Sequence, residues 1–195
     1  QGRPTSSLAP VADLLQEGRH EGVCAYGSSA VGVEANGIPV YAAVEIVTHQ
    51  CLATVGVPPL LGRVFTAEEA PASRPGVRVV VVGYDFWQKV FGGASDVVGR
   101  SFRTDGDSVT VIGVMPRGFR GLRVDDGVDI IAPFGTVIPS PANRLLASYI
   151  LGRLRPGVTL EAARAELVTR SPGMVERVVP ATLSPAERRH PRGVT

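Results

Sequence analysis

The stretch VVVVGYDFWQKVFGG, residues 79–93, does most to decide the fold. Its valines form the centre of a predicted strand, Val77–Val82, which we expect to be buried on both faces. After Gly83, apolar residues recur at the spacing of one face of a helix of about two turns. Gly92 can then supply the left-handed residue that ends the helix. The predicted buried face of this helix carries Phe86, Trp87, Val90 and Phe91.

A strand, a glycine and a short helix also resemble the layout that binds phosphate in nucleotide-binding proteins. However, neither GxxxxGK[ST] nor GxGxxG is present, and Lys89 lies within the helix rather than at its start. The pair Gly92-Gly93 follows the helix, where it offers no amide groups to an anion. We therefore predict that residues 84–93 are packing, with no nucleotide or other cofactor.

Upstream of this stretch the sequence predicts hairpins. Asn36-Gly37 favours a type I′ turn between strands Val31–Ala35 and Ile38–Val47. In the second strand apolar residues alternate with Tyr41, Ala43 and Glu45, which is typical of a half-buried strand. Pro39 favours an edge position beside the turn. Further elements are expected upstream and downstream: a helix over Pro10–Gly18, a strand over Gly22–Tyr26, a helix within Thr48–Val55 and a helix start at Thr66.

Downstream, Asp105-Gly106-Asp107 predicts a second hairpin between Ser101–Thr104 and Ser108–Met115. Together these patterns favour an α+β fold with mixed or antiparallel sheets, hairpins and short helices. From residue 171 onward, prolines and charged residues predict a loosely ordered tail. The remaining predicted elements are strands at Gly127–Phe134 and Leu146–Leu154, and a helix at Thr159–Arg170 that is capped by Thr159 and buries Leu160, Ala163 and Leu167.

The composition is that of a soluble globular protein. Of the 195 residues 44% are hydrophobic and 19% charged, and the net charge of +2 with scattered basic groups argues against nucleic acid as a partner. No run approaches the roughly 18 consecutive apolar residues of a membrane span. We expect the chain to be a soluble piece of a longer protein.

Four residues raise the question of a metal: His20, Cys24, His49 and Cys51. They could hold zinc tetrahedrally if the two segments met, but their spacing matches no standard zinc module. A Cys24–Cys51 disulfide stays open, because spacing alone does not give the geometry. Buried free thiols are the favoured interpretation, since free cysteine behaves as a small hydrophobe. We predict no metal site.

Other candidate chemistry is weak. Gly27-Ser28-Ser29-Ala30 is not the GxSxG nucleophile motif. Asp125–Asp129 lacks the ligand spacing of a calcium loop and reads as a solvated turn. Arg188–Arg192 could touch anionic lipid, although a solvated tail is the simpler interpretation. With three histidines and no catalytic pattern, the residues point to no enzyme and to no catalytic residue.

Several segments match, in the same order, the motifs of one known family. Residues 55–66, VGVPPLLGRVFT, are similar to that family's LGV-x-P-x-LGR-x-F. Residues 80–87 and 91–93 are similar to VVLSYxxW…RFGG. The remaining matches are Asp96–Arg100 with xxVVGR, Val109–Phe119 with xTVIGVxPxGF, Asp129–Pro133 with DxWxP, and Arg153–Thr159 with RLKPGVS. On these segments the chain resembles the MacB-like periplasmic core domain of ABC-transporter permeases.

This resemblance implies a porter-like subdomain, residues 1–62 and 145–195, and a smaller inserted α/β subdomain, residues 63–144. It implies an extracytoplasmic, non-catalytic domain that relays ATP-driven movement of membrane helices to substrate export or extraction. The implied partners are the permease's own membrane helices, a second permease protomer, a cytoplasmic ATPase and an extracytoplasmic adaptor or substrate. A stand-alone extracytoplasmic ligand-binding or sensor module of the same fold is the alternative.

Overall fold

A computed structural model describes the chain over residues 19–35, 38–69, 78–104, 107–123, 127–134, 149–166 and 168–169. The chain divides into two compact units. One is Cys24–Leu151, and the other combines Gln1–Val23 with Gly152–Thr195. The porter-like and inserted subdomains with boundaries at residues 62/63 and 144/145 stay a prediction, because compactness alone does not define them.

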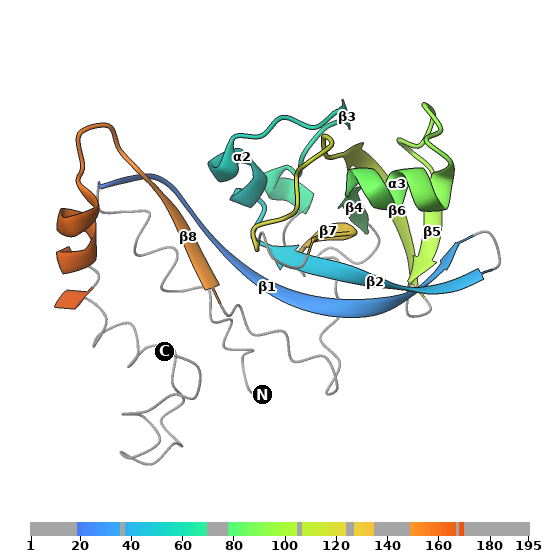
Figure 1. Ribbon diagram of the computed structural model, residues 1–195, viewed down its shortest axis with the longest axis horizontal. Coiled ribbons are helices and arrows are strands. Elements are labelled where there is room, and N and C mark those ends of the chain that lie inside the picture. The colour runs from blue at the N-terminus through green and yellow to red at the C-terminus, as the bar shows by residue number, and fades with distance from the viewer. Residues whose placement is uncertain are drawn as a thin grey trace, which may run out of the picture. The chain divides into compact units, whose positions relative to one another are not determined.

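The strands of the unit Cys24–Leu151 close into a circuit (Figure 1). The pairings run from β1 to β2, β7, β4, β6 and β5, and β5 pairs with β1 again. The β2–β7 and β4–β6 pairs are parallel, and the others are antiparallel. The strands of the circuit are β1 (His20–Ala35), β2 (Ile38–Val47), β4 (Val79–Val82), β5 (Ser101–Thr104), β6 (Asp107–Val114) and β7 (Ile130–Pro133).

Smaller elements are attached to this circuit. A short strand, β3 (Leu61–Gly62), pairs antiparallel with β6, and β8 (Tyr149–Leu154) lies next to β1 in the strand order. The helices are α2 (Cys51–Val55), a 3₁₀ turn η1 (Ala67–Glu69) and α3 (Tyr84–Phe91). The predicted α+β class with a mixed sheet and short helices is confirmed.

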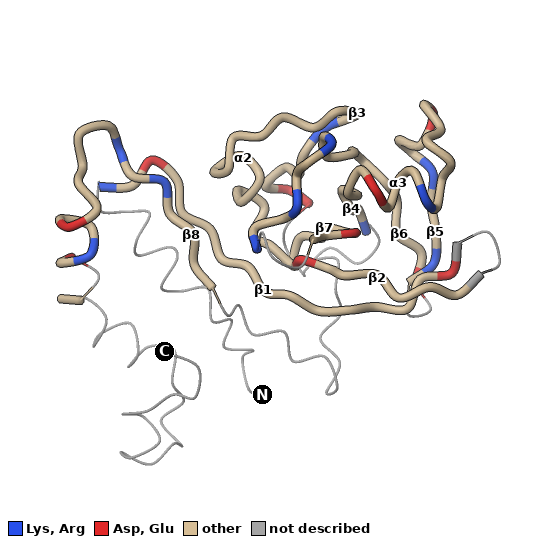
Figure 2. Tube along the Cα trace, in the orientation of Figure 1, with Lys and Arg blue, Asp and Glu red and all other residues tan. Residues whose placement is uncertain are grey.

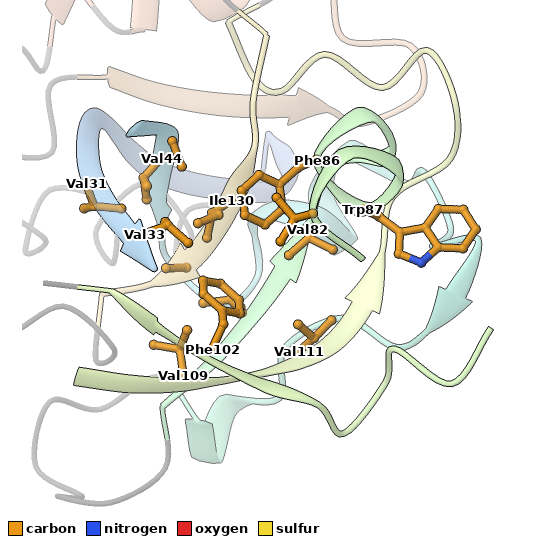
Figure 3. Packing of buried hydrophobic residues seen from close by; sticks show 14 of the residues in the cluster. Val31, Val33, Val44, Val82, Phe86, Trp87, Phe102, Val109, Val111 and Ile130 are labelled. Carbon is orange, nitrogen blue, oxygen red and sulfur yellow. The ribbon is translucent and has the colours of Figure 1, made fainter. Parts of the chain in front are cut away.

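β4 shows how the sheet is covered on both faces. Val80 and Val82 belong to a cluster inside the closed sheet, whereas Val79 and Val81 belong to a second cluster on its outer face. All four side chains are buried, as predicted from the valine run. Figure 3 shows the interior cluster, in which Phe86 of α3 lies among side chains from several strands and the ring of Trp87 lies apart from them. Its labelled members are Val31, Val33, Val44, Val82, Phe86, Trp87, Phe102, Val109, Val111 and Ile130.

Both hairpins form as predicted. Ala35 pairs with Ile38 across the first and Thr104 pairs with Asp107 across the second, so each connection has the length of a two-residue turn. The turn residues themselves lie outside the described residues. Pro39 pairs only with Glu34 of β1, since the β2–β7 ladder begins farther along β2.

One prediction about this region is wrong. β1 is a single strand of 16 residues that runs through Gly27–Ala30, where the sequence predicted a break between two strands. Continuous pairing with β2 from Tyr26 to Ala35 overrides the weak strand propensity of glycine and serine there.

The helix α3 buries its apolar face as predicted. Phe86, Trp87 and Val90 are buried, and Phe91 packs partly buried against the same cluster. The indole Nε1 of Trp87 donates a hydrogen bond to the carbonyl oxygen of Ala94 at 3.0 Å. Gly92 ends the helix with φ of 62°, in the left-handed region.

Charges of both signs are distributed over the described elements (Figure 2). The predicted helix start at Thr66 is a 3₁₀ turn, in which Glu69 accepts a hydrogen bond from the backbone N–H of Thr66 at 3.0 Å. The same carboxylate pairs with Arg63 at 2.6 Å, and this pairing lowers the pKa of Glu69. Local ion pairs therefore account for several of the surface charges.

In the other unit, the end of β8 lies beside the start of β1. The backbone N–H of Arg155 donates to the carbonyl oxygen of Arg19 at 3.0 Å, and Arg19 forms an ion pair with Glu166 at 2.9 Å. Helical residues begin at 160 and continue to 169, with residue 167 not described. Thr159 caps this helix as predicted, since its Oγ1 accepts a hydrogen bond from the N–H of Ala162.

The predicted buried face of this helix is only partly right. Ala163 is 2% exposed, but Leu160 is 76% exposed. Leu160 is the first helical residue, and helical side chains lean toward the N-terminus, so it projects beyond the helix end. The predictions for Leu167, for a helix at Pro10–Gly18 and for a loose tail from residue 171 lie outside the described residues.

Within the described part of the chain, no helix is both long and apolar enough to span a membrane.

Replacement of Trp87 by alanine should destabilise the protein by about 3–5 kcal/mol, as for other buried aromatic truncations. Trp87 is 8% exposed, and its truncation leaves a cavity and removes the hydrogen bond from the indole to Ala94. Urea unfolding of the variant measures the loss. Tyr41→Ala is the matched control, because Tyr41 is 88% exposed, and it should change stability by no more than about 0.5 kcal/mol. Equal losses in the two variants would contradict the packing role.

Candidate functional site

The most unusual group in the described structure is the carboxylate of Glu45. Its neighbours Val44 and Ile46 point into the closed sheet, so Glu45 lies on the outer face of β2. The alternating pattern predicted a solvated face there, yet Glu45 is only 4% exposed. The loop after β6 covers it.

Backbone amides of that loop bind the carboxylate. Both oxygens of Glu45 accept a hydrogen bond from the N–H of Leu122 at 2.9 Å, and Oε1 also accepts one from the N–H of Arg123 at 3.0 Å. Such charge-assisted bonds are stronger than bonds between neutral groups. The carboxylate therefore holds the loop on the sheet.

Gly121 makes this close approach possible. It has φ of 99°, in the left-handed region that disfavours residues with a Cβ. A Cβ built at this position would lie 2.8 Å from Oε1 of Glu45, closer than a carbon and an oxygen pack. The loop thus depends on glycine for its conformation and for its contact with the carboxylate.

Burial and hydrogen bonding act on Glu45 in opposite directions. Burial raises the pKa of Glu45 above the ordinary value of 4.5, and the backbone N–H groups of Leu122 and Arg123 lower it without cancelling that effect. The positive charge of Arg123 lowers it further. The ionised carboxylate is therefore less favourable in the folded protein than in the unfolded chain.

Two tyrosines and an arginine lie close to the same loop. The rings of Tyr26 on β1 and Tyr149 on β8 stack with centroids 5.2 Å apart and an interplanar angle of 25°. The guanidinium carbon of Arg123 lies 5.5 Å from the centroid of the Tyr149 ring, within the range of a cation–π contact. Burial raises the pKa of Tyr26, and the negative charge of Glu45 adds to this rise.

The sequence did not single out Glu45, Tyr26, Arg123 or Tyr149 as a group. A signal was present in β2, because the outer-face positions on either side of Glu45 are the apolar Ala43 and Val47. Apolar residues on both faces of a strand indicate that both faces are covered. The glycine at 121 was a second signal, but only the structure brings it to the carboxylate.

The contacts of Gly83, directly before α3, agree with the predicted packing role of residues 84–93. The N–H of Gly83 donates to the carbonyl oxygen of Asp129 at 2.8 Å, so it is engaged by the protein itself. A Cβ at Gly83 would lie 2.3 Å from the carbonyl oxygen of Val128, which explains the glycine by close backbone packing.

The cysteines are paired with each other. Cys24 on β1 and Cys51 at the start of α2 form a disulfide between Cα atoms 5.0 Å apart, and both residues are fully buried. The favoured interpretation of free thiols is wrong, since the hairpin register brings the end of β2 and the following helix beside Cys24. The zinc hypothesis with His20 and His49 is wrong for the same reason, because bonded sulfurs are not thiolate ligands.

Among the described residues, no three His, Cys, Asp or Glu side chains are grouped to hold a metal ion. Of the acidic segment Asp125–Asp129, residues 125 and 126 lie outside the described residues. Asp129 accepts a hydrogen bond from the backbone N–H of Ala43 at 2.9 Å, which ties the start of β7 to β2. Arg188–Arg192 also lies outside the described residues.

The sequence profile described as "MacB-like periplasmic core domain" matches residues 2–170. The chain belongs to this family, whose members are extracytoplasmic domains of bacterial ABC-transporter permeases. The family is one of transporter domains rather than of enzymes. Curated proteins searched by sequence gave no match.

Solved structures agree in fold. The periplasmic region of MacB from Actinobacillus actinomycetemcomitans superposes with a TM-score of 0.69 at 17% identity, over 85% of this chain and 73% of that one. The extracellular domain of the noncanonic ABC-type transporter YknZ from Gram-positive bacteria gives 0.64 at 15% identity, over 87% of each chain. A domain of a putative permease from Porphyromonas gingivalis gives 0.53 at 17% identity, over 90% and 71%.

Reduction of the disulfide should destabilise the fold by about 3–4 kcal/mol, the chain-entropy value for a cross-link of this span. The two cysteines are 27 residues apart in sequence. Because both are buried, the protein should be unfolded with reductant and refolded in its presence before urea unfolding is measured. Equal urea midpoints for the oxidised and reduced forms would contradict this prediction.

Replacement of Glu45 by glutamine should change the pH dependence of stability. The folded pKa is raised, so the favourable contribution of this group is fully present below its ordinary value of 4.5 and is lost as the pH rises through the raised value. Each unit of pKa difference corresponds to about 1.4 kcal/mol. The wild type should therefore lose stability relative to Glu45→Gln as the pH rises above 4.5 and through the raised pKa.

Urea unfolding of both proteins across this pH range measures the effect. Any pH-independent cost of placing an amide group against the loop cancels in the comparison. Glu34→Gln, at an exposed position of β1, is the control and should follow the wild type. A stability difference between wild type and Glu45→Gln that stays constant with pH would contradict the raised pKa.

Proposed function

We propose that this domain relays ATP-driven movement of the membrane helices of its permease to the export or extraction of a substrate, without catalysing a reaction itself. The observation that carries the proposal is the closed sheet with a filled interior. Strand pairing and tight packing resist deformation, so a closed sheet of this kind moves as a body. Displacement applied at one point of such a body reaches its far side.

The disulfide supports an extracytoplasmic setting. Disulfides persist in oxidising compartments and are rare in the cytosol. The Cys24–Cys51 bond joins β1 to the first turn of α2 and adds a covalent link to the closed sheet. A covalent link of this kind is in keeping with a domain that transmits force outside the membrane.

The partners follow from the proposed role. The domain moves with the membrane helices of its own permease, works beside the same domain of a second protomer, and responds indirectly to a cytoplasmic ATPase. An extracytoplasmic adaptor or the substrate itself receives the movement. A porter-like subdomain, residues 1–62 and 145–195, and an inserted subdomain, residues 63–144, are proposed within this domain, and both contribute strands to the closed sheet.

Distances between spin labels in the full permease with its ATPase, in lipid nanodiscs, test the relay. Labels at Tyr41→Cys and Lys89→Cys use exposed positions, and the native cysteines are blocked in their disulfide. The distance between the Tyr41→Cys labels of two protomers should change between the nucleotide-free and the vanadate-trapped ATP states. The distance between positions 41 and 89 within one domain should stay constant, because the closed sheet moves as a body.

An inter-protomer distance that is the same in both nucleotide states would overturn the proposal. A within-domain distance that changes with nucleotide would overturn the rigid relay in particular. Saturable quenching of Trp87 fluorescence by small molecules in the isolated domain, without any nucleotide-dependent movement, would favour the ligand-binding or sensor module instead.

A further inference from the structure

Two strands, β1 and β8, carry the chain from one compact unit into the other. The division falls between Val23 and Cys24 in β1 and between Leu151 and Gly152 in β8. At the first of these points Cys24 is covalently bonded to Cys51. At the second, the contacts of Tyr149 that the structure describes are non-covalent, so the two strands are attached by different means.

Besides its pairing with β1 and the packing of Leu151 against the outer cluster, β8 is attached through the Tyr149 ring. This ring stacks on Tyr26 with centroids 5.2 Å apart, and the guanidinium of Arg123 lies over it at 5.5 Å. Tyr26 is 9% exposed and fixed in β1, whereas Tyr149 is 43% exposed. One ring of the pair is therefore rigid and the other is accessible, as expected of a contact that can open.

Glu45 determines where Arg123 lies. Its Oε1 accepts a hydrogen bond from the Arg123 N–H at 3.0 Å, and it also binds the preceding residue, Leu122. The same carboxylate contacts Gly121, whose backbone conformation gives the loop its path. The loop position that brings the guanidinium to Tyr149 thus depends on a buried charge.

We propose that Arg123, Tyr149 and Tyr26 form a releasable clamp that holds the first residues of β8, Tyr149–Leu151, against the closed sheet, and that Glu45 is its positioning residue. The significance of the clamp rests on the proposed relay. If Tyr149–Leu151 can be released while the disulfide at Cys24 stays intact, the strand through which force reaches the closed sheet can change. The existence of the clamp is independent of the relay. The charged and titratable groups that face the clamp are Glu45 from β2, Tyr26 from β1, Tyr149 from β8 and Arg123 from the loop.

Amide hydrogen exchange of the isolated protein, followed by NMR at Leu151, tests the clamp. β8 pairs with β1, and the N–H of Arg155 bonds to Arg19, so with the strand period of two the N–H of Leu151 also faces β1 and reports local opening. Arg123→Gln removes the cation but keeps the backbone N–H that binds Glu45. It should speed exchange at this amide by about two- to five-fold, the factor that corresponds to one cation–π contact.

The matched control is Arg117→Gln. Arg117 lies in the same loop and over a tyrosine ring at 5.9 Å, but that ring is Tyr84 of α3. This variant should leave exchange at Leu151 unchanged. Equal exchange at β8 in the two variants, whether raised or not, would overturn the clamp.

Glu45→Gln tests the positioning role. It should speed exchange at Leu122 and Arg123, which lose a charged acceptor, and at Leu151 in the same variant. Faster exchange in the loop with unchanged exchange in β8 would show that Glu45 does not act through Arg123 and would overturn the inference. If Glu45→Gln fails to fold, the comparison of Arg123→Gln with Arg117→Gln still decides whether the clamp exists.

These outcomes are separable from failure of the proposed function. Hydrogen exchange is measured on the isolated domain and requires neither nucleotide nor substrate. Nucleotide-dependent movement is measured in the full permease with labels at positions 41 and 89, away from the clamp. A clamp that is present in a domain that does not move would refute the relay alone, and a moving domain without the exchange effect would refute the clamp alone.

Discussion

The rest of the structure depends on the pairing of β1 along both of its edges. β1 pairs with β2 from Tyr26 to Ala35 and with β5 through Val33 and Glu34, and these pairings close the sheet. A closed sheet satisfies its backbone groups internally but encloses a volume that side chains must fill. Valines from the strands and the aromatic residues of α3 fill it. The amphipathic helix is therefore a consequence of closure as much as of its own sequence.

Closure also leaves an outer face of the sheet. The loop after β6 covers part of this face, and in doing so it buries a carboxylate, which is energetically unfavourable. β2 places Glu45 between two inward-facing residues, so the carboxylate points outward, under the loop that contains Gly121. The loop excludes water from the carboxylate, which favours its neutral form, while the amides of Leu122 and Arg123 favour its ionised form. Exclusion of water has the larger effect. The contact is thus specific in geometry and yet weaker at neutral pH than its short hydrogen bonds suggest.

The sequence predicted the elements well where a local rule applied. The Asn36-Gly37 turn gave the β1–β2 register, and the spacing of Phe86, Trp87 and Val90 gave the buried face of α3. The sequence predicted the environment of a residue poorly where that environment depends on a partner far away in the chain. Strand alternation alone could not show that a loop 77 residues away in sequence covers Glu45. Nor could the spacing of Cys24 and Cys51 show that they meet, because that depends on the register of a hairpin between them.

The closed circuit of strands was also beyond local rules. β7 joins β2 in parallel and β4 in antiparallel orientation, and no pattern within Ile130–Pro133 distinguishes these partners. A buried strand reads as apolar whichever neighbours it has. The pattern of hairpins and short helices predicted the class of fold, but the order of the strands required the structure.

The two strands that lead out of the unit Cys24–Leu151 carry different contacts at their last residues within it. A disulfide at Cys24 breaks only by chemical reduction, and its burial protects it from reductants. A stacked tyrosine under an arginine opens thermally, at a frequency set by weak contacts. Opening of Tyr149–Leu151 would disturb the outer cluster, because Leu151 packs against it. The interior cluster contains no residue of β8 and would stay intact.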